Sequence, residues 1–160
     1  MTDRPLKQYL MTPGPTPVPP AVSGAMAEPI MYHRAPAFIE IYAAALRRLR
    51  PVFGTAGDVL VFSCTGSGAM ESAVANLVRP GDRALVASCG KFGERWGELC
   101  DAFGADTVRH DTEWGSRIDP ADVERVLGEN PAVEVLFTTL SETSTGVVND
   151  VRALAEAAHA

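Results

Sequence analysis

The segment Thr65-Gly-Ser-Gly68 combines two hydroxyl groups with two glycines, between an apolar run and a run compatible with a helix. A turn of this composition exposes several backbone N–H groups, and a helix presents the positive end of its dipole at the same place. Hydroxyls, N–H groups and a helix N-terminus together bind phosphate or a similar anion. The segment therefore predicts an anion-binding site at the start of a helix.

Three interpretations of this turn differ in the ligand. A nucleoside-triphosphate loop needs a lysine followed by serine or threonine at the helix start, and neither stands there. A dinucleotide-binding fold needs a third glycine, where this chain has Glu71, and an acidic residue at the end of the second strand, which ends without one at Gly90. A glycine-containing turn that binds nothing stays open as the third interpretation.

Hydrophobic periodicity places this turn in an alternating α/β pattern. The strand-like runs are 59–63, 83–88, 106–109 and 133–140, and the helix-like runs are 67–78, 93–103, 120–127 and 151–159. Strands that alternate with helices of this length predict a mainly parallel sheet with flanking helices. Ligands of such sheets bind beyond the carboxyl ends of the strands, where this turn falls. Because another strand normally follows such a helix, we expect the domain to be incomplete at residue 160.

The N-terminal part has a different composition. Residues 1–20 are rich in proline, which fixes φ, and they predict an extended arm, with a disordered tail as the alternative. Helices are predicted at 20–28 and 36–53, the second from apolar residues recurring every three or four positions. We therefore expect an arm (residues 1–20), a helical N-terminal segment (21–54) and an incomplete large domain (55–160).

The composition of the 160 residues, with 46% hydrophobic, 21% charged and a net charge of −6, is typical of a soluble globular protein. Because no basic face or long apolar run occurs, we expect neither a nucleic-acid nor a membrane partner. The N-terminus lacks the apolar core of a signal peptide, which favours the cytoplasm. Cys64, Cys89 and Cys100 lack metal-site spacing, so we predict small buried thiols and no metal.

Five short motifs occur in order along the chain. They are Thr12-Pro-Gly-Pro-Thr-Pro-Val-Pro19, His33-Arg34, Thr65-Gly-Ser-Gly-Ala-Met-Glu71, Cys89-Gly-Lys-Phe-Gly-Glu-Arg95 and Ser141-Glu-Thr-Ser-Thr-Gly-Val147. The series resembles the class V pyridoxal-phosphate-dependent aminotransferases of the alanine–glyoxylate and serine–pyruvate type, over essentially all of residues 11–160. The resemblance implies the large domain of a fold-type I PLP-transferase, with pyridoxal 5′-phosphate as the cofactor.

The resemblance also implies roles for individual residues. Thr65, Gly66 and Ser67 match the residues that contact the cofactor phosphate, in agreement with the anion site predicted above. Phe92 matches the aromatic residue that stacks on the pyridine ring, with a core aromatic as the alternative. Thr143 matches the residue that hydrogen-bonds the phenolic oxygen of the ring, with a Ser/Thr turn that closes a strand as the alternative.

Residues of the N-terminal part match the family's substrate side. Gly14, His33 and Arg34 correspond to the region that borders the substrate pocket, in some relatives across a dimer interface. Arg34 would pair with a substrate carboxylate or phosphate. An ordinary surface arginine is the alternative.

The resembled family also uses a lysine that forms a Schiff base with the cofactor, and an acidic residue that faces the pyridine nitrogen. Both lie downstream of the last motif in that family. The lysines of this chain are Lys7 and Lys91, and neither matches the family's lysine. We therefore expect no catalytic residue in this chain, and we expect the chain alone to be inactive.

The function implied by the resemblance is transfer of an amino group from a small amino acid, of the serine or alanine type, to a 2-oxo acid such as glyoxylate or pyruvate. A homodimer is implied for the full-length protein. Because the lysine is missing, a non-catalytic module that binds phosphate or pyridoxal phosphate, or that only dimerises, is the alternative. A nucleotide-dependent oxidoreductase is a further alternative, disfavoured by the missing glycine and acidic residue.

Overall fold

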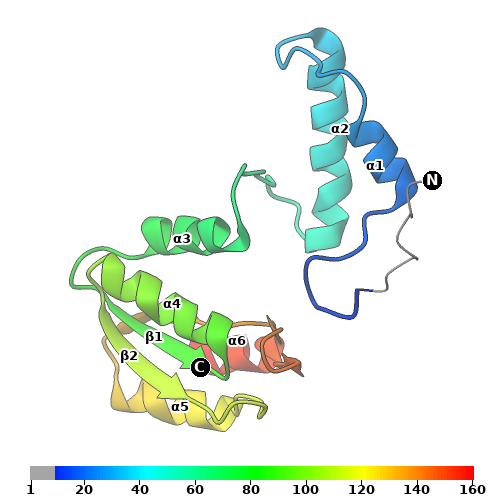
Figure 1. Cartoon of the computed structure of the whole chain (residues 1–160). Helices are drawn as coiled ribbons and strands as arrows, with labels where there is room; N and C mark the ends of the chain where they lie inside the picture. The colour runs from blue at the N-terminus through cyan, green and yellow to red at the C-terminus, as the bar shows by residue number, and fades with distance from the viewer. Residues whose placement is uncertain (1–9) are drawn as a thin grey trace. The chain divides into compact units, whose positions relative to one another are not determined.

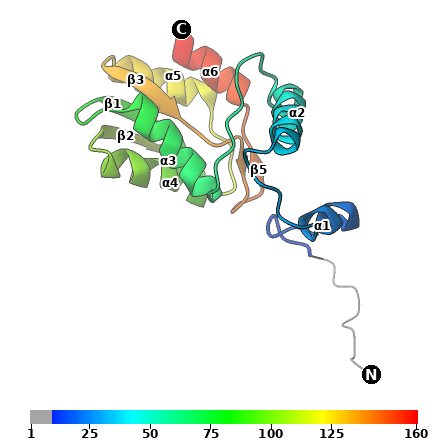
Figure 2. The ribbon, with the colours of Figure 1, turned by 90° about the horizontal axis from the view of Figure 1, so that it is seen from above.

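A computed structural model describes residues 10–160 of the chain. The described residues form two compact units, one that ends at Val61 and one that spans Phe62–Ala160 (Figures 1 and 2). Residues 1–9, which include the beginning of the predicted arm and Lys7, lie outside the described residues. The predicted division into segments 1–20, 21–54 and 55–160 stays a prediction.

The first unit contains the helices α1 (Pro20–Met26) and α2 (Pro36–Phe53). Both carry a proline in the first turn, where the missing N–H would have had no helical partner. The bounds predicted for α2 are confirmed, and the helix ends at Gly54, whose φ of 61° is the left-handed conformation that glycine adopts readily. The helix α1 ends at Met26, before the predicted residue 28.

The second unit contains a parallel sheet in which β1 (Arg83–Ser88) lies between β2 (Asp106–Asp111) and β3 (Val133–Phe137). The α/β fold with a parallel sheet is therefore confirmed. The strand β3 stops at Phe137 instead of residue 140. The chain then forms a short antiparallel pair, β4 (Ser141–Glu142) and β5 (Val147–Val148), which the sequence analysis does not predict.

The helices of the second unit lie on both faces of this sheet, as Figure 2 shows. They are α3 (Gly66–Leu77), α4 (Lys91–Ala102), α5 (Pro120–Glu129) and α6 (Val151–His159). Because successive side chains of a strand point to opposite faces, Ala84 and Val86 pack into a core with α3 and α4, whereas Leu85 and Ala87 pack into a second core with α5 and α6. Among the described residues, no helix is long and apolar enough to cross a membrane.

The strand predicted at residues 59–63 is wrong. The structure assigns no strand there, and Leu60, Val61 and Phe62 are exposed. A strand exists only where backbone N–H and C=O groups pair with a neighbouring strand. Within the part of the chain that the structure describes, residues 59–63 have no such neighbour. An apolar segment without regular secondary structure therefore leads into the glycine turn in place of a sheet strand.

The cysteines differ in their exposure. Cys89 and Cys100 are buried thiols as predicted, but Cys64, in the segment before α3, is exposed. The prediction is wrong for Cys64 because the apolar segment around it does not enter the sheet. Over residues 10–160, no three His, Cys, Asp or Glu side chains gather in a group that could hold a metal ion.

Two buried glycines of α4 give opposite expectations for the same substitution. A Cβ added at Gly93 would lie 2.8 Å from the Cα of Ser88 at the end of β1, whereas the atoms nearest to one at Gly97 belong to the flexible guanidinium of Arg109. We expect Gly93→Ala to lower the free energy of unfolding by about 1–3 kcal/mol through overpacking. Gly97→Ala is expected to change it by less than about 1 kcal/mol, because alanine favours the helix. Denaturant unfolding measures both, and equal losses would contradict this packing.

Candidate functional site

The first turn of α3 carries the predicted anion site. Thr65 precedes the helix with extended backbone (φ −78°, ψ 171°), and its side chain makes no capping hydrogen bond. The first N–H groups of an α-helix have no partner inside the helix, and Gly66 and Ser67 hold these positions. The Thr65 hydroxyl and these two N–H groups are therefore available to an anion at the helix N-terminus.

This turn borders a cavity of about 530 Å³ within the second unit. Its walls come from the start of α3, the start of α4 and the segment that follows β3. The lining residues are Thr65, Gly66, Ser67, Met70, Phe92, Trp96, Thr138, Thr139, Leu140, Ser141 and Thr143. The structure thus brings together all the residues that the sequence analysis assigns to cofactor binding.

The lining combines hydroxyl groups with aromatic side chains. The Phe92 side chain is exposed at the start of α4, and Trp96 lies one turn further along. The hydroxyl oxygens of Thr138 and Thr139 are buried without a hydrogen-bond partner among the described residues. A cavity of this size with a few polar groups is typical of a small-molecule site. The hydroxyl groups, the free N–H groups of α3 and the aromatic side chains fit a flat aromatic ligand that carries an anionic group and an oxygen substituent on its ring.

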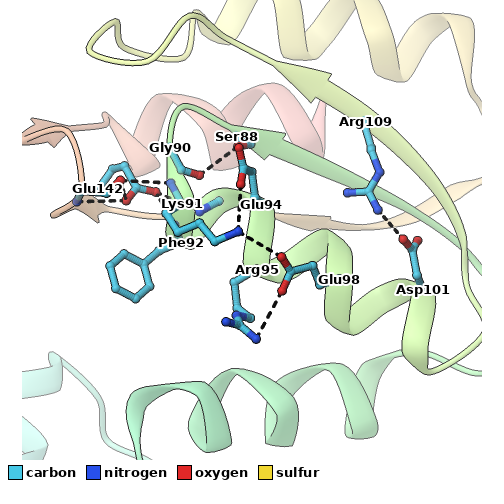
Figure 3. Close-up of polar contacts among 12 residues, drawn as sticks. Ser88, Gly90, Lys91, Phe92, Glu94, Arg95, Glu98, Asp101, Arg109 and Glu142 are labelled. Atoms are coloured by element: carbon cyan, nitrogen blue, oxygen red, sulfur yellow. Dashed lines mark hydrogen bonds and ion pairs between the residues drawn. The ribbon is translucent and has the colours of Figure 1, made fainter.

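Glu142 is a fully buried carboxylate beside the cavity. Its Oε2 atom accepts hydrogen bonds from the N–H groups of Phe92, at 3.0 Å, and Gly93, at 2.8 Å. Its Oε1 atom accepts from the hydroxyl of Ser144, at 2.6 Å, and from the Ser144 N–H, at 3.3 Å. Figure 3 shows this carboxylate facing the backbone at the start of α4. Glu142 therefore caps α4, and the helix dipole stabilises its charge.

Burial acts to raise the pKa of the Glu142 carboxyl, but the hydrogen bonds from the Ser144 hydroxyl and from the N–H groups of Gly93, Phe92 and Ser144 outweigh it, so the pKa is lowered from its ordinary value of 4.5. A group whose pKa is lower in the folded state stabilises the fold above its unfolded pKa, and this contribution is lost as pH falls through the folded pKa. The charged form of Glu142 is thus the form that the fold prefers.

A pH dependence of stability follows from this preference. We expect the unfolding free energy of the wild type to exceed that of Glu142→Gln most clearly at about pH 7, and the difference to shrink as pH is lowered to about 3. Urea denaturation of both proteins across this range measures the difference. A difference that stays constant over the whole range would contradict the role of the charge.

Asn149 holds the segment after β3 in place. Its side chain is buried, accepts a hydrogen bond from the Ile118 N–H at 3.0 Å, and donates one to the Thr139 carbonyl at 2.8 Å. Its own N–H donates to the Leu140 carbonyl at 2.8 Å. These bonds fix the backbone of two residues that line the cavity.

Glu142 and Asn149 have no role predicted from the sequence. Glu142 stands in the last of the five motifs, two residues after the apolar run 133–140, and this position was the available signal. Its partners at the start of α4 lie 49 and 50 residues away in sequence. Local patterns cannot reveal such partners.

Lys91 is not part of the cavity lining. Its Nζ atom pairs with Glu94 and Glu98, at 3.1 Å in both cases, on the exposed side of α4 (Figure 3). Hydrogen bonds from the ammonium to Glu94 and then Glu98, together with their charges, raise the pKa of Lys91. A raised pKa keeps the amine protonated, which is the opposite of what a nucleophilic lysine needs.

The three residues predicted for the substrate side belong to the first unit. Gly14, His33 and Arg34 are all exposed, and the His33 ring lies against Tyr32 with 5.0 Å between the ring centroids. Because they belong to a different unit from the cavity, their part in a substrate pocket stays a prediction.

Almost the whole sequence matches one family of known proteins. A family model described as aminotransferase class-V matches residues 8–160. A protein of Synechococcus named soluble hydrogenase, small subunit, is 42% identical over 151 residues, which cover 92% of this chain and 39% of the relative. The L-aspartate–glyoxylate aminotransferase of Paracoccus denitrificans is 33% identical over 151 residues, which cover 92% of this chain and 38% of the relative.

Solved structures of other proteins share this fold. The aspartate aminotransferase of subgroup IV from Thermus thermophilus superimposes with a TM-score of 0.87 and 39% sequence identity, covering 94% of this chain and 42% of that protein. The chain thus spans about two fifths of the length of the relatives that it matches.

Proposed function

Because the chain belongs to the class-V aminotransferase family, we propose that it forms the N-terminal part of a pyridoxal-phosphate-dependent aminotransferase and supplies one wall of the cofactor site. The observation that carries this proposal is that the start of α3, the start of α4 and the segment after β3 line one shared cavity. Each of these three segments contributes a residue type that the cofactor needs.

The start of α3 binds the phosphate group of the cofactor. The Thr65 hydroxyl, which caps nothing, and the N–H groups of Gly66 and Ser67 donate hydrogen bonds to the phosphate oxygens. The dipole of α3 adds a favourable interaction with the negative charge. These residues anchor and orient the ligand and take no part in bond making.

The other two segments hold the pyridine ring. Phe92 places an aromatic face against the ring, and the Thr143 hydroxyl donates a hydrogen bond to the ring's phenolic oxygen. Phe92 and Trp96 also restrict the access of water to this wall of the cavity. When bound, pyridoxal phosphate supplies an electron sink that stabilises a carbanion on the substrate.

The residue that exchanges protons with the substrate is not among those of this sequence. Lys91 is protonated and paired with Glu94 and Glu98 outside the cavity lining, and Lys7 lies outside the residues that the structure describes. We therefore propose that these 160 residues alone bind the cofactor without catalysing transamination.

The proposed substrates are a small amino acid of the serine or alanine type and a 2-oxo acid such as glyoxylate or pyruvate. Support comes from relatives named serine–glyoxylate and L-aspartate–glyoxylate aminotransferase. Gly14, His33 and Arg34 are proposed to border the substrate pocket, with Arg34 pairing with a carboxylate. A homodimer is proposed for the full-length protein.

One observation favours a second candidate. The cavity lining contains no lysine, so a module that binds phosphate or pyridoxal phosphate without catalysis is the alternative. The name soluble hydrogenase belongs to the Synechococcus relative, and the family model that matches this chain is that of the aminotransferases.

Titration with pyridoxal phosphate tests the proposal. We expect saturable binding to the chain by calorimetry, and clearly weaker binding of pyridoxal, which lacks the phosphate. The complete polypeptide that contains this sequence is then assayed with serine or alanine and glyoxylate. Binding with turnover supports the enzyme, whereas binding without turnover for any amino donor supports the module. Absence of binding to both proteins would refute both candidates.

A further inference from the structure

The start of α4 is capped by a segment that follows it by about 50 residues in sequence. The residue that precedes this helix is Gly90, which has no side chain to cap it. Instead, Glu142 Oε2 accepts from the N–H groups of Phe92 and Gly93, and Ser144 Oγ accepts from the N–H group of Lys91 at 3.0 Å. All three N–H groups of the first turn are thereby satisfied from one distant segment.

This cap joins two walls of the cavity. Phe92 stands on the capped turn of α4, and Thr143 lies between the two capping residues Glu142 and Ser144. Both Phe92 and Thr143 line the cavity, whereas Glu142 does not. The carboxylate thus connects the backbones that carry the aromatic ring and the hydroxyl without reaching the ligand space.

The fit around Glu142 requires both carboxylate oxygens. One oxygen accepts two N–H groups and the other accepts the Ser144 hydroxyl and N–H. Glutamine has the same shape, but its NH₂ group donates and cannot accept: facing Ser144 it leaves the Ser144 N–H without its acceptor, and facing the helix it leaves the N–H groups of Phe92 and Gly93 without theirs. The approach is also close, since a Cβ added at Gly90 would lie 2.5 Å from Glu142 Cγ.

We propose that Glu142 is a positioning residue of the cofactor site, which fixes the position of the Phe92 ring relative to the Thr143 hydroxyl. The inference rests on the proposed function for the identity of the ligand. The phosphate contacts at the start of α3 are independent of Glu142, because none of its hydrogen bonds reaches Thr65, Gly66 or Ser67. Loss of the carboxylate should therefore weaken ring binding and leave phosphate binding unchanged.

The test uses the complete polypeptide that contains this sequence, as wild type, Glu142→Gln and the control Glu129→Gln. Glu129 is exposed on α5, pairs with Arg125 and is not among the residues that line the cavity. Three quantities are measured: affinity for pyridoxal phosphate, affinity for inorganic phosphate, and the circular dichroism that the bound cofactor acquires, which reports the orientation of its ring.

For Glu142→Gln we expect pyridoxal phosphate to bind about ten- to a hundredfold more weakly, the loss that corresponds to a charge-assisted hydrogen bond. Inorganic phosphate should bind as in the wild type, and the dichroism per bound cofactor should change. Glu129→Gln should match the wild type in all three. Hydrogen exchange at the Phe92 and Gly93 amides should become faster in Glu142→Gln, because a neutral amide oxygen is a weaker acceptor for these N–H groups than the carboxylate.

Equal weakening of both ligands, or unchanged affinity and dichroism in Glu142→Gln, would overturn the inference. If the wild type itself fails to bind pyridoxal phosphate, the proposed function is refuted. Hydrogen exchange at the Phe92 and Gly93 amides then still tests whether Glu142 caps α4. Should Glu142→Gln not fold, Ser144→Ala is the second variant, since it removes one donor to Glu142 and the acceptor of Lys91. It should show a smaller change in the same direction.

Discussion

Replacing Ser67 with aspartate is expected to weaken the binding of pyridoxal phosphate about a thousandfold while the fold is kept. The new carboxylate would stand in the first turn of α3, against the phosphate of the proposed ligand. Two unit charges at about 4 Å near a protein surface interact by about 4 kcal/mol, and here the interaction is repulsive. An acidic side chain in the first turn of a helix is itself favourable, so the apo protein should not be destabilised.

Calorimetric titration measures the affinity, and thermal unfolding of the apo protein measures stability. The matched variant is Ser67→Asn, which has the size of aspartate without its charge and is expected to lose no more than about a hundredfold in affinity. If Ser67→Asp binds pyridoxal phosphate as tightly as Ser67→Asn, the phosphate does not lie at the start of α3.

Replacing Asn149 with leucine is expected to cost about 2–5 kcal/mol of unfolding free energy. The change leaves the buried N–H of Ile118 and the carbonyl of Thr139 without their partner. A buried polar group that loses its partner costs its full desolvation penalty. Because the Thr139 backbone borders the cavity, affinity for the cofactor should fall together with stability.

Asn76→Leu is the control, since Asn76 is exposed on α3 and bonds only the Ser72 carbonyl one turn earlier. Leucine favours a helix more than asparagine, so this change should stay within about 0.5 kcal/mol. Denaturant unfolding compares the two variants with the wild type. Similar small effects for both would show that Asn149 does not hold the segment after β3.

The site was predictable to the extent that its residues carry local signals. Thr65, Gly66 and Ser67 form a turn whose composition indicates an anion site wherever it occurs before a helix. Phe92 and Thr143 were assigned from short motifs, and the structure places both around the same cavity as that turn. Their roles toward a ligand stay predictions, because they depend on contacts that only a bound cofactor reveals.

Glu142 shows why the rest could not be predicted. Its neighbours in sequence do not show which groups its carboxylate binds, because its N–H partners belong to a helix that precedes it in sequence. The same holds for Asn149, whose partners are the N–H group of Ile118 and the carbonyl of Thr139. Long-range hydrogen bonds depend on the order of strands in the sheet, and sequence patterns do not specify that order.

The sequence by itself determined the helices and most strands, because their periodicity is a property of consecutive residues. The bounds of α2, β1 and α6 agree with the pattern residue for residue. Only the tertiary structure decided which apolar segment becomes a strand and which buried polar groups join separate segments. Residues 59–63 are as apolar as a strand and yet form none, since a strand also needs a neighbour to accept its hydrogen bonds.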